Sequence, residues 1–205
     1  MAMSALSGLG MRLAVPVAVA SLLSGVCLAA EGTPADESGQ QAVWTQKELS
    51  FVFQGFTTRY SCDGLKDKMT SALLQLGANK KDLQVHETGC VRGFGRPDFF
   101  PGVRVKMTVL QPAASSTDSS QAPVAAHWKP IAVNLRDVNS YPNDSGECEL
   151  YEQIRDKVLP LFTTRNVNLS GTCVPHQESA AGPSLKLEVL QPDATAPVAS
   201  TQPSR

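Results

Sequence analysis

The cysteines are the residues of this chain whose chemistry follows the clearest pattern. The sequence has five, and Cys62 and Cys148 each stand at the start of a predicted helix. A thiol at a helix N-terminus has a lowered pKa and can act as a nucleophile. Thiol oxidoreductases usually carry Cys-x-x-Cys, which is absent here. We therefore expect two structural disulfides, Cys62–Cys90 and Cys148–Cys173. The alternative is an exported thiol-dependent redox enzyme or sensor that uses Cys62 or Cys148.

No other pattern in the sequence indicates catalysis. His86, His127 and His176 form no His-x-x-x-His motif and have no Cys-x-x-Cys beside them, so no zinc site is predicted. A Gly-x-Ser-x-Gly nucleophile elbow and a glycine-rich phosphate loop are also missing from the sequence. We expect a protein without catalytic residues, cofactor or metal, and not an enzyme.

One loop has a composition typical of a binding surface. The segment Arg92–Pro101 contains two arginines and three phenylalanines in ten residues. Arginine and aromatic side chains are favoured at binding hot spots. The predicted binding residues are Arg92, Phe94, Arg96, Phe99 and Phe100. The alternative is that these phenylalanines cap the core beneath a long hairpin loop.

An internal repeat predicts the elements that position this loop. The unit Trp44–Pro112 and the unit Trp128–Pro192 both begin with tryptophan, both end in Val-Leu-Gln-Pro and both contain two cysteines. Self-similarity at a fixed offset indicates one supersecondary unit used twice. We predict an α+β fold that duplicates a disulfide-stapled βαββ unit, with an antiparallel sheet and one helix per unit. Whether the units form two domains or one merged sheet stays open.

The helix of each unit is predicted from a stripe of apolar residues. Asp63–Leu76 carries them at spacings of four, four and three, and the second unit repeats these spacings. The two stripes are Leu65, Met69, Leu73 and Leu76, and Leu150, Ile154, Val158 and Leu161. Ser61 suits the start of the first helix and Gly77 its end. Pro160 should stop or kink the second helix near Val158.

The strands are predicted from β-forming residues and from the alternation of apolar and polar side chains. They cover Leu49–Phe56, Leu83–His86, Val103–Leu110, Val167–Leu169 and Leu185–Leu190. In each unit the first cysteine then lies at the helix start and the second at the end of the following strand. Each disulfide would pin a helix to the sheet and stabilise its unit by roughly 3 kcal/mol.

The first thirty residues have the order of a secretory signal peptide. Arg12 is their one charge, Leu13–Leu23 is apolar, and small residues lead to Ala30. The alternatives are an uncleaved membrane anchor and a lipoprotein acylated at Cys27. The remaining segments are predicted as a flexible lead (31–43), a first unit (44–112), a Ser/Ala/Pro linker (113–127), a second unit (128–192) and a disordered tail (193–205).

The net charge and the cysteines limit the classes of protein to which this chain can belong. Without the signal peptide the chain has 17 basic and 19 acidic residues, a net charge of −2, with no basic cluster. This excludes the basic footprint typical of a nucleic-acid binder. An even number of remaining cysteines indicates disulfides in an oxidising compartment. We therefore predict a non-catalytic periplasmic or secreted protein that binds an unknown envelope protein or surface ligand and contacts the membrane only through its export signal.

Overall fold

The computed structural model describes residues 39–56, 58–93, 95–115, 122–135, 147–171 and 182–193. The predicted signal peptide, Phe94, Cys173 and His176 fall outside these ranges. The first half contains β1 (Gln40–Val52), α1 (Cys62–Gln75), β2 (Gln84–Thr88), β3 (Gly102–Pro112) and a short 3-10 turn, η1 (Ala113–Ser115). The second half contains β4 (Val124–Val133), α2 (Glu147–Gln153), β5 (Thr164–Ser170) and β6 (Ser184–Pro192).

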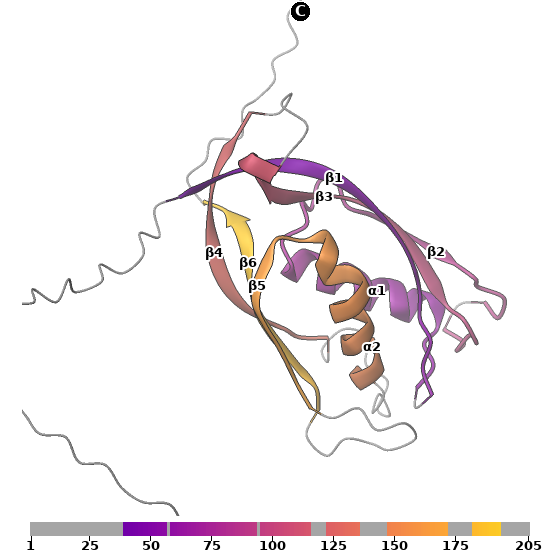
Figure 1. The fold of residues 1–205 in the computed structure, drawn as a ribbon. Coiled ribbons are helices and arrows are strands. Elements are labelled where there is room, and N and C mark those ends of the chain that lie inside the picture. Colours follow the sequence, from indigo (N-terminus) through magenta and orange to yellow (C-terminus); the bar gives the residue numbers. More distant parts are fainter. Residues whose placement is uncertain are drawn as a thin grey trace, which may run out of the picture. The chain divides into compact units, whose positions relative to one another are not determined.

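The six strands form one antiparallel sheet in the order β2-β3-β1-β4-β6-β5. The strands curve around α1 and α2, which both lie on the concave side (Figure 1). The predicted α+β class and the antiparallel sheet are confirmed. Both halves of the described chain contribute to a single sheet, so the two predicted units do not form separate sheets. Each half supplies three of its strands and one α-helix.

The two halves meet where β1 pairs with β4. Gln40 lies opposite Ala126 and Ala42 lies opposite Val124 in this short antiparallel pairing. Residues 40–43 were predicted as part of a flexible lead and residues 124–127 as part of a linker, but both stretches are strand. Their backbone groups are paired across the junction, and Ala42 and Ala126 are fully buried there. The small polar and alanine residues of these two stretches did not predict strands, although the stretches form the ends of β1 and β4.

Helix α1 begins and ends where its local signals predict. The Ser61 side chain accepts a hydrogen bond from the Gly64 N–H at 3.2 Å, which caps the N-terminus. At the other end Gly77 has φ +92°, and the Ala78 N–H donates to the Leu73 carbonyl at 3.0 Å. This is a Schellman ending, which requires the left-handed conformation that glycine adopts readily. The four residues of its predicted apolar stripe are fully buried.

Helix α2 is interrupted as Pro160 predicts. Regular α-helix ends at Gln153 and continues as a π-helical turn, η2 (Ile154–Val158), and a 3-10 turn, η3 (Leu159–Leu161). Proline has no N–H to donate, and its ring would clash with the carbonyl four residues earlier in an α-helix. The wider turn keeps Ile154 and Val158 fully buried while the chain turns away.

The main core lies between the sheet and the two helices. It joins the apolar stripes of α1 and α2 to inward side chains of β1, β3, β4 and β6. A second, smaller cluster contains the residues of opposite parity on the same strands, so it lies on the other face of the sheet. Its members are Ala42, Leu110, Ala126 and Leu190, with Trp44, Val124 and Trp128 packed against them.

One ion pair is buried within the main core and connects the two halves. Lys68 on α1 lies 2.8 Å from Glu147, the first residue of α2, and their side chains are 1% and 5% exposed. The Lys68 ammonium also donates to the Leu135 carbonyl at 3.0 Å. A buried charge is costly without a partner, so this pair fixes the start of α2 against α1.

Candidate functional site

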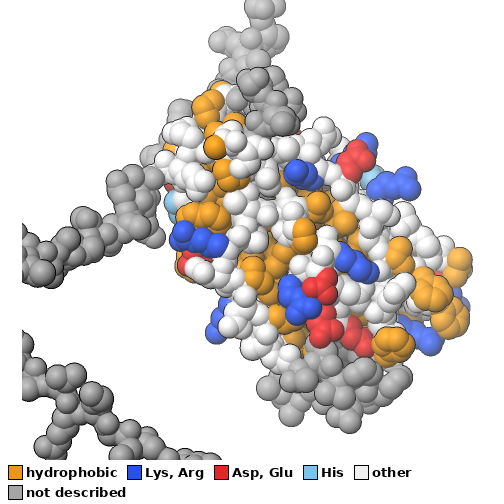
Figure 2. Space-filling view, in the orientation of Figure 1, with side chains coloured by type: hydrophobic (Ala, Val, Ile, Leu, Met, Phe, Trp, Pro, Cys, Tyr) orange, Lys and Arg blue, Asp and Glu red, His pale blue; other side chains and the backbone are white. Residues whose placement is uncertain are grey.

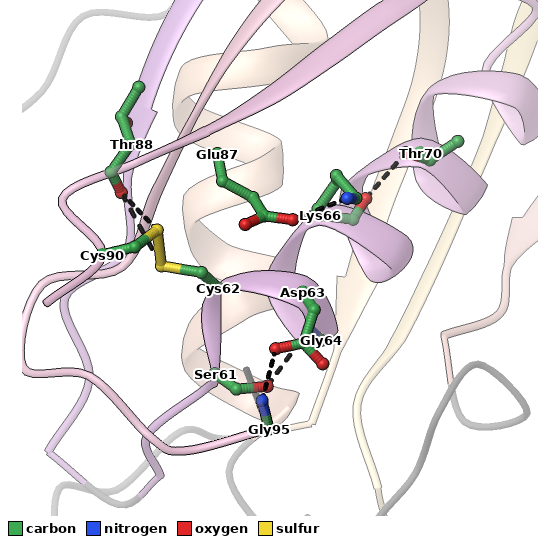
Figure 3. A network of polar contacts seen from close by, with 10 residues as sticks. All are labelled: Ser61, Cys62, Asp63, Gly64, Lys66, Thr70, Glu87, Thr88, Cys90 and Gly95. Carbon is green, nitrogen blue, oxygen red and sulfur yellow. Dashed lines mark hydrogen bonds and ion pairs between the residues drawn. A yellow bond between two sulfur atoms is a disulfide. The ribbon is translucent and has the colours of Figure 1, made fainter. Parts of the chain in front are cut away.

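The predicted binding residues lie on the connection between β2 and β3, which we call the stapled loop (residues 89–101). Thr88 and Gly102 face each other at its base in the β2–β3 pairing. A disulfide joins Cys90 in the loop to Cys62 at the start of α1, with the two Cα atoms 6.0 Å apart (Figure 3). The predicted Cys62–Cys90 bond is confirmed, and it ties the loop to the helix. Closing a loop of this length stabilises the fold by roughly 3–4 kcal/mol.

The second predicted disulfide is described only at one end. Cys148 is disulfide-bonded as well, but its partner lies outside the described residues. The pairing with Cys173 stays a prediction. Of the cysteines in the described part of the chain, Cys62, Cys90 and Cys148, each is bonded. Neither Cys62 nor Cys148 therefore presents a free thiolate in this structure.

A buried carboxylate holds the stapled loop from inside. Asp98 is 1% exposed, and its side chain accepts the backbone N–H groups of Val91 and Arg92 at 3.3 and 3.5 Å. The Asp98 N–H donates to the Tyr60 carbonyl at 3.0 Å. Pro97 next to it forms an isolated antiparallel bridge with Ser61. The loop backbone is thus fixed to the segment that precedes α1.

A second carboxylate connects the loop to the first turn of α1. Asp63 accepts the Gly95 N–H at 2.9 Å (Figure 3). One turn further on, the Lys66 ammonium lies 2.6 Å from the Glu87 carboxylate on β2, and this hydrogen bond raises the pKa of Lys66. These contacts and the disulfide place α1, β2 and the loop in one network.

Glycine is required at two points of the stapled loop. Gly89 has φ +72°, and an added Cβ would lie 2.6 Å from the Phe100 carbonyl oxygen. Gly93 has φ +80°, and its carbonyl accepts the Arg96 N–H at 3.3 Å in a turn. Other residues rarely adopt such backbone angles. A side chain at either position would therefore strain the backbone of the loop.

The outward side chains of the stapled loop are apolar and basic. Phe99 is 51% exposed, Phe100 63% and Val91 81%, so Phe99 and Phe100 do not cap the core. The guanidinium groups of Arg92 and Arg59 lie 4.3 and 4.7 Å from the centre of the Phe99 ring. Such cation–π contacts hold charge beside an exposed aromatic ring.

Arg92 and Phe99, two of the predicted binding residues, are in contact, and Arg59 lies against the same ring. Arg92, Phe99 and Phe100 share the stapled loop with Arg96, which is exposed, while Phe94 lies outside the described residues. Arg59 was not predicted, because it precedes α1 in the sequence and no local motif links it to Phe99. Figure 2 shows apolar and basic side chains gathered at the right-hand end of the view, where Figure 1 places the connection after β2.

The histidines are dispersed over the described part of the fold. His86 is exposed on β2, and the His127 Nδ1 atom lies 2.6 Å from the Asp193 carboxylate, while His176 is not described. Within the described ranges, no three His, Cys, Asp or Glu side chains are grouped as a metal site would require. No helix in these ranges is both long and apolar enough to cross a membrane.

Two shallow cavities lie away from the stapled loop. One of about 430 Å³ is lined by Trp44, Lys81, Asp82 and neighbouring polar side chains of β1, β2 and β3. Another of about 380 Å³ lies over β4, β5 and β6 beside Asn166. Neither is lined by a cysteine, a histidine or a serine.

Comparison of the chain with models of protein families, with curated proteins and with solved structures found no match. The features of the described residues that bear on function are the stapled loop and the chemistry of its exposed side chains. That loop is anchored by a disulfide and presents aromatic rings and guanidinium groups to solvent.

Proposed function

We propose that this protein is a non-catalytic, exported binding module that recognises a component of the cell envelope through the stapled loop. One observation carries the proposal: Phe99 and Phe100 are 51% and 63% exposed on a loop whose backbone is held by a disulfide and two carboxylates. Exposed apolar side chains that are grouped on one surface typically mark an interaction site.

The way in which the loop is held supports a binding role. Ordering a flexible loop on binding costs conformational entropy, and a loop that is already ordered avoids this cost. The disulfide, Asp98 and Asp63 hold the backbone before any partner arrives. The Cys62–Cys90 disulfide also agrees with export to the periplasm or beyond, where such bonds persist.

We also infer that the two halves are copies of one βαββ unit. Trp44 lies opposite Leu110, and Trp128 lies opposite Leu190. Three residues before each tryptophan stand Gln41 and Ala125, and these two residues face each other where β1 pairs with β4. A twofold axis between equivalent units would place one such pair of equivalent residues opposite each other. In this proposal only the first copy acquired the Arg/Phe loop, since the second has Pro-His-Gln-Glu-Ser in the matching place.

The alternative function is an exported thiol-dependent redox enzyme or sensor that uses Cys62 or Cys148. Its observable would be a free or mixed-disulfide cysteine in protein taken directly from the envelope. Thiol trapping followed by non-reducing peptide mapping distinguishes the two proposals. Complete Cys62–Cys90 and Cys148–Cys173 bonding supports the binding module, and a reactive thiol supports the redox protein.

The proposed function is tested by capture from an envelope fraction. Replacing Arg92, Phe94, Arg96 and Phe99 together with Gln, Ser, Gln and Ser should abolish capture while the circular dichroism spectrum and the Cys62–Cys90 bond are retained.

A matched control changes an exposed arginine and an exposed apolar residue of the second half, Arg155→Gln with Val167→Ser. This control should capture as the wild type does. Unchanged capture by the loop variant would remove the basis of the proposed function.

A further inference from the structure

We propose that the envelope component is an anionic phospholipid surface, on which the stapled loop rests with Val91, Phe99 and Phe100 among the headgroups. Arg59, Arg92 and Arg96 would then contact lipid phosphates. This inference depends on the proposed function, since it names the ligand of the same loop. It also revises the expectation that the membrane is contacted only through the export signal.

The orientation of charge around the loop favours an anionic surface. The carboxylates point inward: Asp98 is 1% exposed and binds loop N–H groups, and Asp63 accepts the Gly95 N–H. Arg59, Arg92 and Arg96 are exposed, and no carboxylate of the described residues forms a salt bridge with them. The outward surface is therefore cationic although the protein as a whole is not, and cationic clusters are attracted to anionic lipid.

The shape of the apolar surface also favours lipid. Val91 and Phe100 are 81% and 63% exposed, so they project from the loop instead of lining a groove. Anchors in protein interfaces usually fill well-packed pockets, whereas the bilayer interface accepts projecting apolar groups flanked by basic residues. The geometry therefore favours lipid over a protein partner.

The contact between Phe99 and its two arginines also fits a lipid surface. The Arg59 and Arg92 guanidinium groups lie within 4.7 Å of the ring centre. A Phe99 ring at headgroup depth would bring both charges to the level of the phosphates. Arginine donates two parallel hydrogen bonds to phosphate, which lysine cannot do with the same geometry.

The test is co-sedimentation of the full chain with vesicles of phosphatidylcholine, with and without phosphatidylglycerol. Every variant carries the same N-terminal segment, so binding through residues 1–30 is a constant background. We expect tighter binding to the phosphatidylglycerol vesicles, weakened by added salt because salt screens charges. The triple variant of Arg59, Arg92 and Arg96 to Gln should lose roughly fivefold in affinity for each arginine.

The apolar contribution is tested separately. Phe99→Ser with Phe100→Ser should lower the affinity by about tenfold or more, because both side chains lose apolar area that the interface would bury. The Arg155→Gln, Val167→Ser control should bind as the wild type does. In a Phe100→Trp variant, tryptophan emission should shift to shorter wavelength and be quenched by brominated lipid only when phosphatidylglycerol is present.

The outcomes separate this inference from the proposed function. No preference for phosphatidylglycerol, or equal binding by the loop variants, would overturn the lipid inference. If loop-dependent capture of an envelope protein persists in that case, the proposed function stands and the partner is a protein. If capture is also independent of the loop, both proposals fail.

Discussion

The buried ion pair between Lys68 and Glu147 offers the sharpest test of how the two halves are held together. We expect Lys68→Met to lower the free energy of unfolding by about 3–5 kcal/mol, because it leaves the Glu147 carboxyl group in the core without the ammonium group that it pairs with. The magnitude follows from the geometry, since the two side chains are 1% and 5% exposed and 2.8 Å apart. Methionine and lysine have similar helix propensities, so α1 itself should be little affected.

The same helix provides a matched control. Lys66 pairs with Glu87 at 2.6 Å, but these side chains are 37% and 34% exposed. Lys66→Met should therefore cost less than about 1 kcal/mol, the range for exposed pairs. The contrast between the two substitutions isolates burial, because the residue types and the helix are the same.

Urea denaturation followed by circular dichroism measures both free energies, with the disulfides kept oxidised. A loss of 3–5 kcal/mol should lower the melting temperature by about 6–20 °C. The double variant of Lys68 and Glu147 to methionine should recover more than half of the loss, since it removes both buried charges. The reasoning is refuted if Lys68→Met costs no more than Lys66→Met, or if the double variant is less stable than the single one.

Three further predictions concern the stapled loop and the opposite end of the sheet. Gly89→Ala should cost about 1–3 kcal/mol from its left-handed backbone and close carbonyl contact, measured by urea denaturation. Changing Cys62 and Cys90 to serine should lower the free energy of unfolding by about 2–4 kcal/mol. A variant or a reduced protein as stable as the oxidised wild type would contradict this. The hydrogen bond from Arg165 lowers the pKa of Glu188. The stability that this hydrogen bond contributes is therefore present above the ordinary pKa of a carboxyl group and is lost as the pH falls through the lower pKa of Glu188 in the folded protein. Thermal unfolding across acidic pH should show a smaller loss of stability in the Arg165→Gln variant.

Local patterns in the sequence were sufficient for the helices and for one disulfide. Ser61 and Gly77 mark the ends of α1 because a cap needs only neighbouring backbone groups. Pro160 interrupts the second helix because the missing N–H and the ring clash act within one turn. The Cys62–Cys90 bond was predicted from the two cysteines of one unit, and the helix start and the strand end that carry them lie close together.

Contacts between distant segments required the tertiary structure. The β1–β4 pairing unites residues that looked like a lead and a linker, because an alanine-rich stretch becomes strand only when another strand supplies its hydrogen bonds. Lys68 and Glu147 carried no signal of burial, since each looks like an ordinary charged residue of a helix.

The candidate site shows the same division. Its composition was evident in the sequence from the arginines and phenylalanines of residues 92–100. Folding alone decided that Asp98 and Asp63 turn inward to backbone N–H groups, that Phe99 and Phe100 stay exposed, and that Arg59 lies over the Phe99 ring. Which side of a loop faces solvent depends on the surfaces it packs against, and those surfaces come from elements far away in the chain.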